Sequence, residues 1–187
     1  MRIFALCLAL CCVPCAEAAD VLSDSTVTAW RADGALHVEA SFHIDVPPSV
    51  AWRVMTDYDH MATYVPRLKE SRIVSVDPER MLVAQKGTAN FAGFSHDWEV
   101  EREVRLQPES LIASRALRGN VKRMEMETRF TPEGPGVRIQ YRALTVPDFW
   151  IPPIIGPSLM KGQVTDQFIA LATEMHRRHR DPAAARQ

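Results

Sequence analysis

Apolar and polar side chains alternate without a break over residues 35–44, which read ALHVEASFHI. A period of two residues is typical of a β-strand with one buried face. Further strand-like stretches follow after residue 67, separated by turn residues such as Asp77-Pro78-Glu79 and Gly119-Asn120. We expect these strands at Leu68–Val76, Met81–Thr88, Phe94–Leu106, Leu111–Arg118, Val121–Phe130 and Val137–Val146. Together with Ala35–Ile44, the pattern predicts about seven antiparallel strands.

Helical patterns occur at two places in the chain. Pro47-Pro48-Ser49 ends the first strand and begins a short helix over Val50–Thr56, since proline is tolerated in a first helical turn. The turn-rich Asp57–Pro66 has room for a second. Pro157–Arg178 has apolar residues three and four positions apart, which predicts an amphipathic helix of about 20 residues. This helix is long enough to cover the sheet, so we expect an α+β fold in which a curved antiparallel sheet wraps around it.

The first eighteen residues have the layout of a secretory signal peptide. A positive Arg2 precedes an apolar run over residues 3–13, and Ala16-Glu17-Ala18 forms a small-x-small cleavage site. The run is shorter than the roughly 20 residues that cross a bilayer. We expect cleavage after Ala18 and export to the periplasm of a Gram-negative bacterium, or secretion; a buried N-terminal helix is the alternative.

We expect the chain after the signal peptide to consist of three segments. Residues 19–34 are expected to form an N-terminal extension, residues 35–180 a single folded domain, and residues 181–187 a disordered tail. All four cysteines lie in the first fifteen residues. The mature protein would therefore contain no disulfide and no thiolate chemistry, and core packing alone would stabilise it.

Strand parity sorts the side chains of the sheet into two faces. On Phe94–Leu106 one face is almost entirely charged, so the other should point inward. The candidate ligand-cavity residues are then Phe94, His96, Trp98, Arg102, Met124, Met126, Thr128 and Tyr141 from the strands, with Met160 and Val164 from the helix. Apolar walls with few polar groups are typical of a small-molecule pocket. The same pattern would also serve a filled core.

His96 and Arg102 are exceptions among these residues, because burying an unpaired charge is costly. They lie six positions apart, roughly 20 Å along a strand, so they cannot act on one bond together. We expect Arg102 to reach solvent past the apolar wall or to pair with a carboxylate such as Asp57 or Asp166, with ligand orientation as the alternative. His96 is expected at the rim of the cavity and not as a catalytic base.

The connection between the last strand and the last helix is unusual. Residues 146–157 contain four prolines but also Phe149, Trp150 and Ile151. Loops normally lie at the surface, so apolar side chains there either cover something or meet a partner. We expect Phe149, Trp150 and Ile151 to form an entrance loop that covers the cavity. A plug of the core and a wedge that touches a membrane transiently are the alternatives.

The charge balance and the motif content of the sequence argue against several classes of function. The 187 residues include 22 Lys+Arg and 23 Asp+Glu, and this balance gives no electrostatic reason to expect a nucleic-acid partner. The sequence has no G-x-S-x-G, no H-E-x-x-H and no phosphate-binding loop. His176 and His179 lie among arginines, which favours a solvated helix end over a metal site. We expect no assembled catalytic motif, no metal and no cofactor.

Several short segments resemble one known superfamily. They are Trp52–Tyr58, Tyr64–Lys69, Gly119–Glu125 with Arg129-Phe130, and Ile155-Gly156-Pro157. The chain resembles the START-like (SRPBCC) superfamily over residues 35–178, in particular its polyketide cyclase/dehydrase and coenzyme Q-binding branch. The resemblance implies a helix-grip fold around a hydrophobic cavity that binds lipids, quinones, sterols or polyketides. It implies catalysis for only a minority of members, and no universal catalytic residue.

Three functional hypotheses follow. The first is an exported protein that binds a hydrophobic small molecule (a lipid, quinone or polyketide-like compound) between the sheet and the C-terminal helix, for carriage or sequestration. The second is a cyclase or dehydratase-type enzyme in the same cavity, which needs polar groups such as His96 with Tyr58 or Arg115 to converge. The third is an interaction module that binds another protein, which a filled core would favour.

Overall fold

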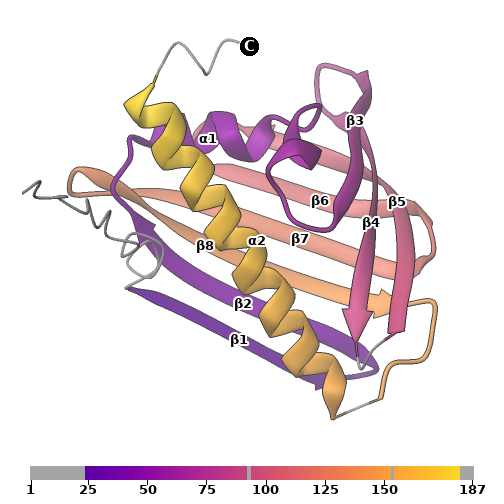
Figure 1. Cartoon of the computed structure of the whole chain (residues 1–187). Helices are drawn as coiled ribbons and strands as arrows, with labels where there is room; N and C mark the ends of the chain where they lie inside the picture. Colours follow the sequence, from indigo (N-terminus) through magenta and orange to yellow (C-terminus); the bar gives the residue numbers. More distant parts are fainter. Residues whose placement is uncertain (1–23, 92–93, 153, 182–187) are drawn as a thin grey trace, which may run out of the picture.

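The computed structural model describes residues 24–91, 94–152 and 154–181. Within these residues, eight strands, two α-helices and one 3-10 helix follow one another (Figure 1). They are β1 (Ser25–Ala32), β2 (Ala35–Ile44), α1 (Pro48–Thr56), η1 (Met61–Thr63), β3 (Leu68–Val76), β4 (Met81–Phe91), β5 (Phe94–Gln107), β6 (Leu111–Gly119), β7 (Val121–Glu133), β8 (Gly136–Pro147) and α2 (Ile155–Arg180).

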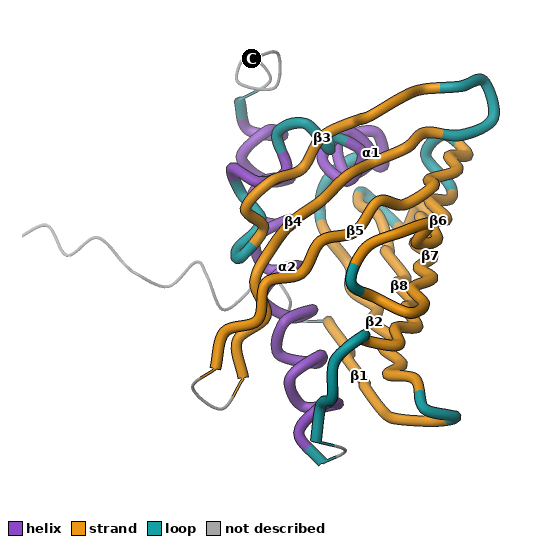
Figure 2. The backbone as a smooth tube through the Cα atoms, turned by 90° about the vertical axis from the view of Figure 1, so that its right-hand side faces the viewer, coloured by secondary structure: helices purple, strands orange, loops and turns teal. Residues whose placement is uncertain are grey.

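The strands form one antiparallel sheet in the order β1-β2-β8-β7-β6-β5-β4-β3. Figure 1 shows α2 crossing this sheet diagonally, and Figure 2 shows that the sheet is curved, with β1, β2, β7 and β8 to one side of α2. This is the α+β helix-grip architecture expected from the sequence. The predicted bounds of β2 and β3 match the observed ones, and the later strands extend a few residues further than expected.

The first strand lies in the segment that was expected to be an N-terminal extension. β1 pairs with β2 along its whole length, from Ser25 opposite Phe42 to Ala32 opposite Ala35. Asp33 and Gly34 connect the two strands with positive φ angles of 50° and 77°, as in the tight turns that suit a hairpin. The sequence did not indicate β1 because none of its residues is fully buried. Its position depends on β2, a partner that local periodicity does not reveal.

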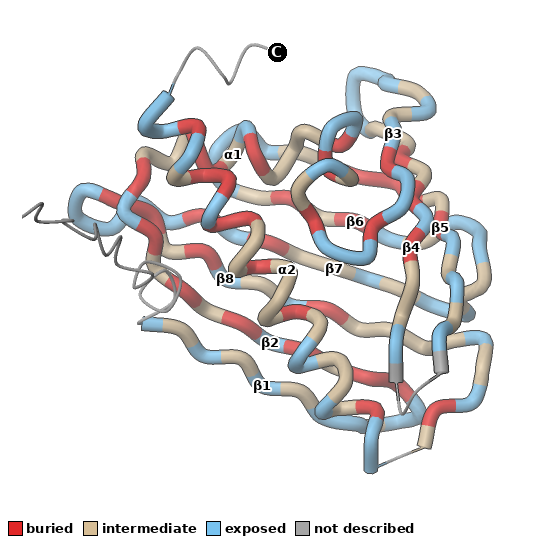
Figure 3. Tube along the Cα trace, viewed as in Figure 1, coloured by how far each residue is buried: buried red, intermediate tan, exposed pale blue. Residues whose placement is uncertain are grey.

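Helix α2 supplies the apolar ridge that the sheet surrounds. Its 26 residues span about 39 Å, two residues longer at each end than predicted. Its buried side chains include Val164, Phe168, Leu171 and Met175. The Phe168 ring packs against Phe42 on β2, with ring centroids 4.3 Å apart. Buried positions alternate along the strands beneath the helix (Figure 3), so this part of the interior is a filled core.

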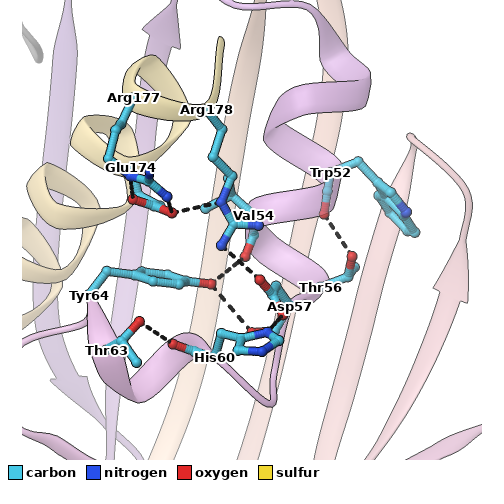
Figure 4. Close-up of polar contacts among 10 residues, drawn as sticks. All are labelled: Trp52, Val54, Thr56, Asp57, His60, Thr63, Tyr64, Glu174, Arg177 and Arg178. Carbon is cyan, nitrogen blue, oxygen red and sulfur yellow. Dashed lines mark hydrogen bonds and ion pairs between the residues drawn. The ribbon is translucent and has the colours of Figure 1, made fainter. Parts of the chain in front are cut away.

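A polar cluster attaches the C-terminal end of α2 to the segment that follows α1 (Figure 4). Arg178 donates hydrogen bonds to Asp57 Oδ2 (2.7 Å) and to Glu174 Oε1 (2.6 Å). Each carboxylate has a second partner: Arg177 bonds to Glu174, and His60 Nδ1 lies 2.6 Å from Asp57 Oδ1. Because the cluster joins segments 121 residues apart, it fixes one end of α2 relative to α1 and the turn that follows it.

The partners of these two carboxylates also determine their ionisation. Burial opposes the charged form of Asp57, but hydrogen bonds from His60 and Arg178 outweigh it and lower the pKa of Asp57. Hydrogen bonding to Arg177 outweighs burial at Glu174 and lowers its pKa as well. Both groups are therefore ionised at neutral pH.

Neither α-helix in the described part of the chain has the length and apolar composition needed to cross a membrane.

Candidate ligand cavity

A cavity of about 250 Å³ lies between the sheet, helix α2 and the segment that joins α1 to β3. Side chains from β4 to β8 form its floor, and Leu159, Met160, Gln163 and Val164 of α2 form its roof. Most of the lining is apolar, with methionines and aromatic rings prominent. Such walls suit a bulky hydrophobic ligand, because methionine side chains adapt their shape readily.

Most of the residues proposed from strand and helix periodicity lie in this wall. Those that line the cavity are Trp98, Arg102, Met124, Met126, Thr128, Tyr141, Met160 and Val164, together with Phe149 and Ile151 of the loop before α2. Strand parity therefore identified the face of the sheet that the cavity occupies. Their contact with a ligand stays a prediction.

Three of the proposed residues differ from the rest. His96 does not line the cavity, but its ring packs on Phe149, which does, with ring centroids 3.8 Å apart. Trp150 is 77% exposed and does not line the cavity. The side chain of Phe94 lies outside the described residues. Of the three loop residues, Phe149 and Ile151 therefore lie in the wall and Trp150 lies at the surface, and the role of the loop as an entrance stays a prediction.

Sequence reasoning missed several polar groups in the wall: Gln85 on β4, Ser114 on β6, and Gln163 and Gln167 on α2. Ser114 could have been found by parity, since it alternates with the charged Arg115 on its strand. Tyr58, which the sequence offered only as a polar partner for the enzyme alternative, also lines the cavity.

Two arginines, Arg67 and Arg102, line this wall, and Arg102 is the more deeply buried. Only 7% of it is exposed, and Nη1 donates a hydrogen bond to Ser114 Oγ (3.2 Å). The guanidinium also lies over the Tyr58 ring, 5.4 Å from its centroid. The expected pairing with Asp57 or Asp166 is wrong: Asp57 pairs with Arg178, and Asp166 pairs with Arg67 at 2.6 Å. The chain folds so that both carboxylates already have other cationic partners.

The two tyrosines near Arg102 are neutral at physiological pH. Burial raises the pKa of Tyr58, and the positive charge of Arg102 offsets part of this effect. Burial likewise raises the pKa of Tyr141 to about 12, with the same partial offset from Arg102. The Tyr141 hydroxyl donates to the sulfur of Met126 at 3.3 Å. These phenols can donate hydrogen bonds to a ligand, but neither is a base at pH 7.

Close backbone packing holds Trp98 in the wall. Gly87 lies opposite Trp98 in the β4–β5 register. A Cβ atom at Gly87 would come within 2.5 Å of the Trp98 ring and 2.6 Å of the Arg67 carbonyl oxygen. Glycine is therefore required here because the indole lies directly on the neighbouring backbone.

The polar groups suggested for an enzyme do not converge. His96 packs against Phe149, whereas Tyr58 lies beside Arg102, further along the sheet. Arg115 is on the opposite face of the sheet, where it pairs with Glu103 at 3.4 Å. The described residues also contain no group of three or more His, Cys, Asp or Glu that could hold a metal. The geometry argues against catalysis by His96 with Tyr58 or Arg115.

A second hollow, of about 750 Å³, lies on the outer face of the sheet between β1 and β5. It is open and strongly charged, and its charges are matched within the protein. Glu103 pairs with Arg105 and Arg115, and Glu39 pairs with Arg142 at 3.3 Å. Because these surface charges are already paired, the inner cavity is the better candidate for a ligand site.

Comparison with known families decides the assignment. The profile of the family described as "Polyketide cyclase / dehydrase and lipid transport" matches residues 35–176. The chain belongs to this family. Its match runs from the start of β2 to residue 176, within the last turns of α2, and so includes every element that forms the cavity. Comparison with curated proteins gives no significant sequence match.

Solved structures similar to this family member share its fold. A STAR-related lipid transfer protein from Xanthomonas axonopodis has a TM-score of 0.65 at 12% identity, covering 82% of this chain and 94% of its own. The Zhui aromatase/cyclase from Streptomyces sp. R1128 has a TM-score of 0.62 at 19% identity, covering 77% and 95%. A START superfamily protein from Mycobacterium smegmatis has a TM-score of 0.65 at 14% identity, covering 75% and 97%. The START-like resemblance inferred from the sequence is confirmed.

Proposed function

We propose that the protein binds a hydrophobic small molecule (a lipid, quinone or polyketide-like compound) in the inner cavity and carries or sequesters it. The observation that supports this most strongly is the cavity itself, because an apolar volume of about 250 Å³ remains beside a well-packed core. The family description names lipid transport and polyketide chemistry, and both act on hydrophobic molecules. The absence of convergence among His96, Tyr58 and Arg115 favours binding over their joint catalysis.

The volume limits the class of ligand. Small-molecule pockets commonly occupy roughly 300–1,000 Å³, so a cavity of about 250 Å³ lies below the lower end of this range. A single acyl chain or a compact ring system suits such a space better than a two-chain phospholipid. We therefore expect a ligand with one apolar body.

The loop before α2 is suited to form the entrance of the inner cavity. Phe149 and Ile151 line the cavity, whereas Trp150 and Ile154 are 77% and 90% exposed. An exposed tryptophan beside an apolar pocket suits transient contact with a membrane surface, from which a ligand would enter. We expect Trp150→Ser to reduce co-sedimentation with phospholipid vesicles without changing binding of a ligand supplied in solution.

Export belongs to the same proposal. The arrangement of Arg2, the apolar run and Ala16-Glu17-Ala18 supports a signal peptide cleaved after Ala18. A carrier outside the cytoplasm would protect its hydrophobic ligand from water between membranes. Detection of intact Met1 as the main form in the cytoplasm would contradict this part of the proposal.

A blocked cavity tests the binding function. Ala89→Trp would place an indole in the cavity wall, and Ala84→Trp would place one on the outer face of the same strand. With an uncharged probe such as Nile red, we expect the first variant to lose binding and the second to keep it, both with native circular dichroism. Equal binding by both variants would contradict the site. Recovery of a chemically altered ligand would instead support the cyclase or dehydratase alternative.

A further inference from the structure

The wall of the inner cavity contains a positive charge that the protein does not neutralise. Arg102 is 93% buried, lines the cavity, and makes one hydrogen bond to the described residues, to Ser114. Its Nε is buried with no hydrogen-bond partner in the described structure. A guanidinium has five N–H donors, so most of its donor capacity is unused.

No carboxylate compensates for this charge. The described lining residues include no Asp or Glu. The nearby acidic residues on other elements have other partners, since Asp57 bonds to Arg178 and Asp166 bonds to Arg67. The second arginine of the wall, Arg67, is therefore already neutralised, whereas Arg102 is not. The Tyr58 ring gives Arg102 only a cation–π contact, at 5.4 Å.

A buried guanidinium without an ionic partner lowers the stability of the protein when no ligand is bound. A buried charge normally has an ionic partner, because its loss of hydration is otherwise uncompensated. A bound anion would supply the missing partner. The planar guanidinium matches a carboxylate in shape and forms strong charge-assisted hydrogen bonds with it.

We infer that the cavity selects amphipathic monocarboxylic acids, whose carboxylate is bound by Arg102 while the apolar body fills the remaining space. This inference rests on the proposed binding function and names the ligand class. One charge in the wall calls for one charge on the ligand, which disfavours dianionic phosphate esters. A neutral quinone or alcohol would leave the guanidinium without an ionic partner.

The position of Arg102 along the sheet orients the ligand. Trp98 lies four residues earlier on the same face of β5, about 13 Å away along the strand. His96, two residues before Trp98 on β5, packs on Phe149 of the loop before α2. Arg102, at the other end of this row, faces Tyr58 beyond the end of α1. The carboxylate would therefore lie at the α1 end, with the apolar body directed past Trp98 towards Phe149.

The test compares acids with neutral analogues of the same shape. Dodecanoate is paired with dodecan-1-ol, and 2-naphthoate with 2-naphthamide, each titrated into delipidated protein at pH 7.5 by calorimetry. We expect the better-binding acid to exceed its analogue by roughly 10- to 100-fold in affinity, as for hydrogen bonds to a charged group. Arg102→Met should remove this preference, and Arg102→Lys should restore part of it because the charge is retained.

A matched control lies on the same strand. Arg105→Met makes the same substitution on the outer face, where Arg105 pairs with Glu103, and it should leave the preference unchanged. Arg102→Met should also melt at the same temperature as the empty wild type or higher, since it removes an unneutralised buried charge. A lower melting temperature, with acid preference retained, would assign Arg102 a purely structural role and overturn the inference.

The remaining outcomes separate this inference from the proposed function. Equal binding of acid and neutral analogue in both pairs would overturn the head-group assignment while supporting a hydrophobic site. Failure of all four compounds and of Nile red to bind, with no ligand extracted from the purified protein, would overturn the binding function itself.

Discussion

Replacing Arg178 by methionine should loosen the C-terminal end of α2 and lower stability in a pH-dependent way. The Arg178 side chain is 10% exposed and bonds to both Asp57 and Glu174 (Figure 4). Methionine is also long and unbranched, so it keeps part of the apolar packing while it removes the charge and both hydrogen bonds. The variant therefore isolates the polar contribution of the cluster.

The magnitude follows from the partners that remain. Removing one partner from a fully buried ion pair costs about 3–5 kcal/mol. In this cluster Asp57 keeps His60 and Glu174 keeps Arg177, and Asp57 is partly exposed. We therefore expect a smaller loss, about 2–3 kcal/mol at pH 7, or roughly 4–12 °C in melting temperature. Arg177→Met is the matched control, because the half-exposed Arg177 pairs with Glu174 and does not contact Asp57, so its loss should cost about 1 kcal/mol or less.

Urea denaturation at pH 7 and at lower pH provides the assay. The pKa values of Asp57 and Glu174 are lowered in the folded protein. Their stabilising effect is therefore present above the ordinary carboxyl pKa, about 4, and is lost as the pH falls through the folded values. The difference between wild type and Arg178→Met should shrink as the pH approaches about 3. A loss no larger than that of Arg177→Met, or a difference that does not change with pH, would refute the reasoning.

Three further predictions concern the wall, the backbone and the N-terminus. Trp98→Ala should weaken binding of an apolar probe, which a probe titration measures. It should also cost less stability than Phe168→Ala, which removes a packed core ring and should cost about 3–5 kcal/mol; thermal denaturation compares the two variants. Gly87→Ala should displace the Trp98 ring, which a shift in tryptophan emission would report, and unchanged emission would contradict the close packing. N-terminal sequencing of exported protein should begin at Ala19.

The sequence predicted the parts of the fold that local patterns specify. The bounds of β2 and β3 were correct because regular periodicity and flanking turn residues mark both ends of each strand. Parity also placed Trp98, Met124 and Met126 in the cavity wall, since one charged face leaves only one face for the interior. β1 was missed because its residues are at most half-buried and its pairing partner lies across a turn.

The environment of Arg102 could not be predicted in the same way. Its pairing depended on which carboxylates were still available, and Asp57 and Asp166 bond to other arginines only once α2 is packed in place. The exposure of Trp150 could not be predicted for a related reason. A proline-rich loop has no fixed period, so its sequence does not tell which neighbours point inward. Charge partners and loop orientation are properties of the assembled tertiary structure.

Native mass spectrometry of the protein purified from the cells that produce it tests the central claim most directly. We predict a population heavier than the polypeptide by the mass of one small molecule, which organic extraction releases and which Ala89→Trp lacks. Protein that carries no adduct under gentle ionisation, and that binds no apolar probe afterwards, would contradict the account.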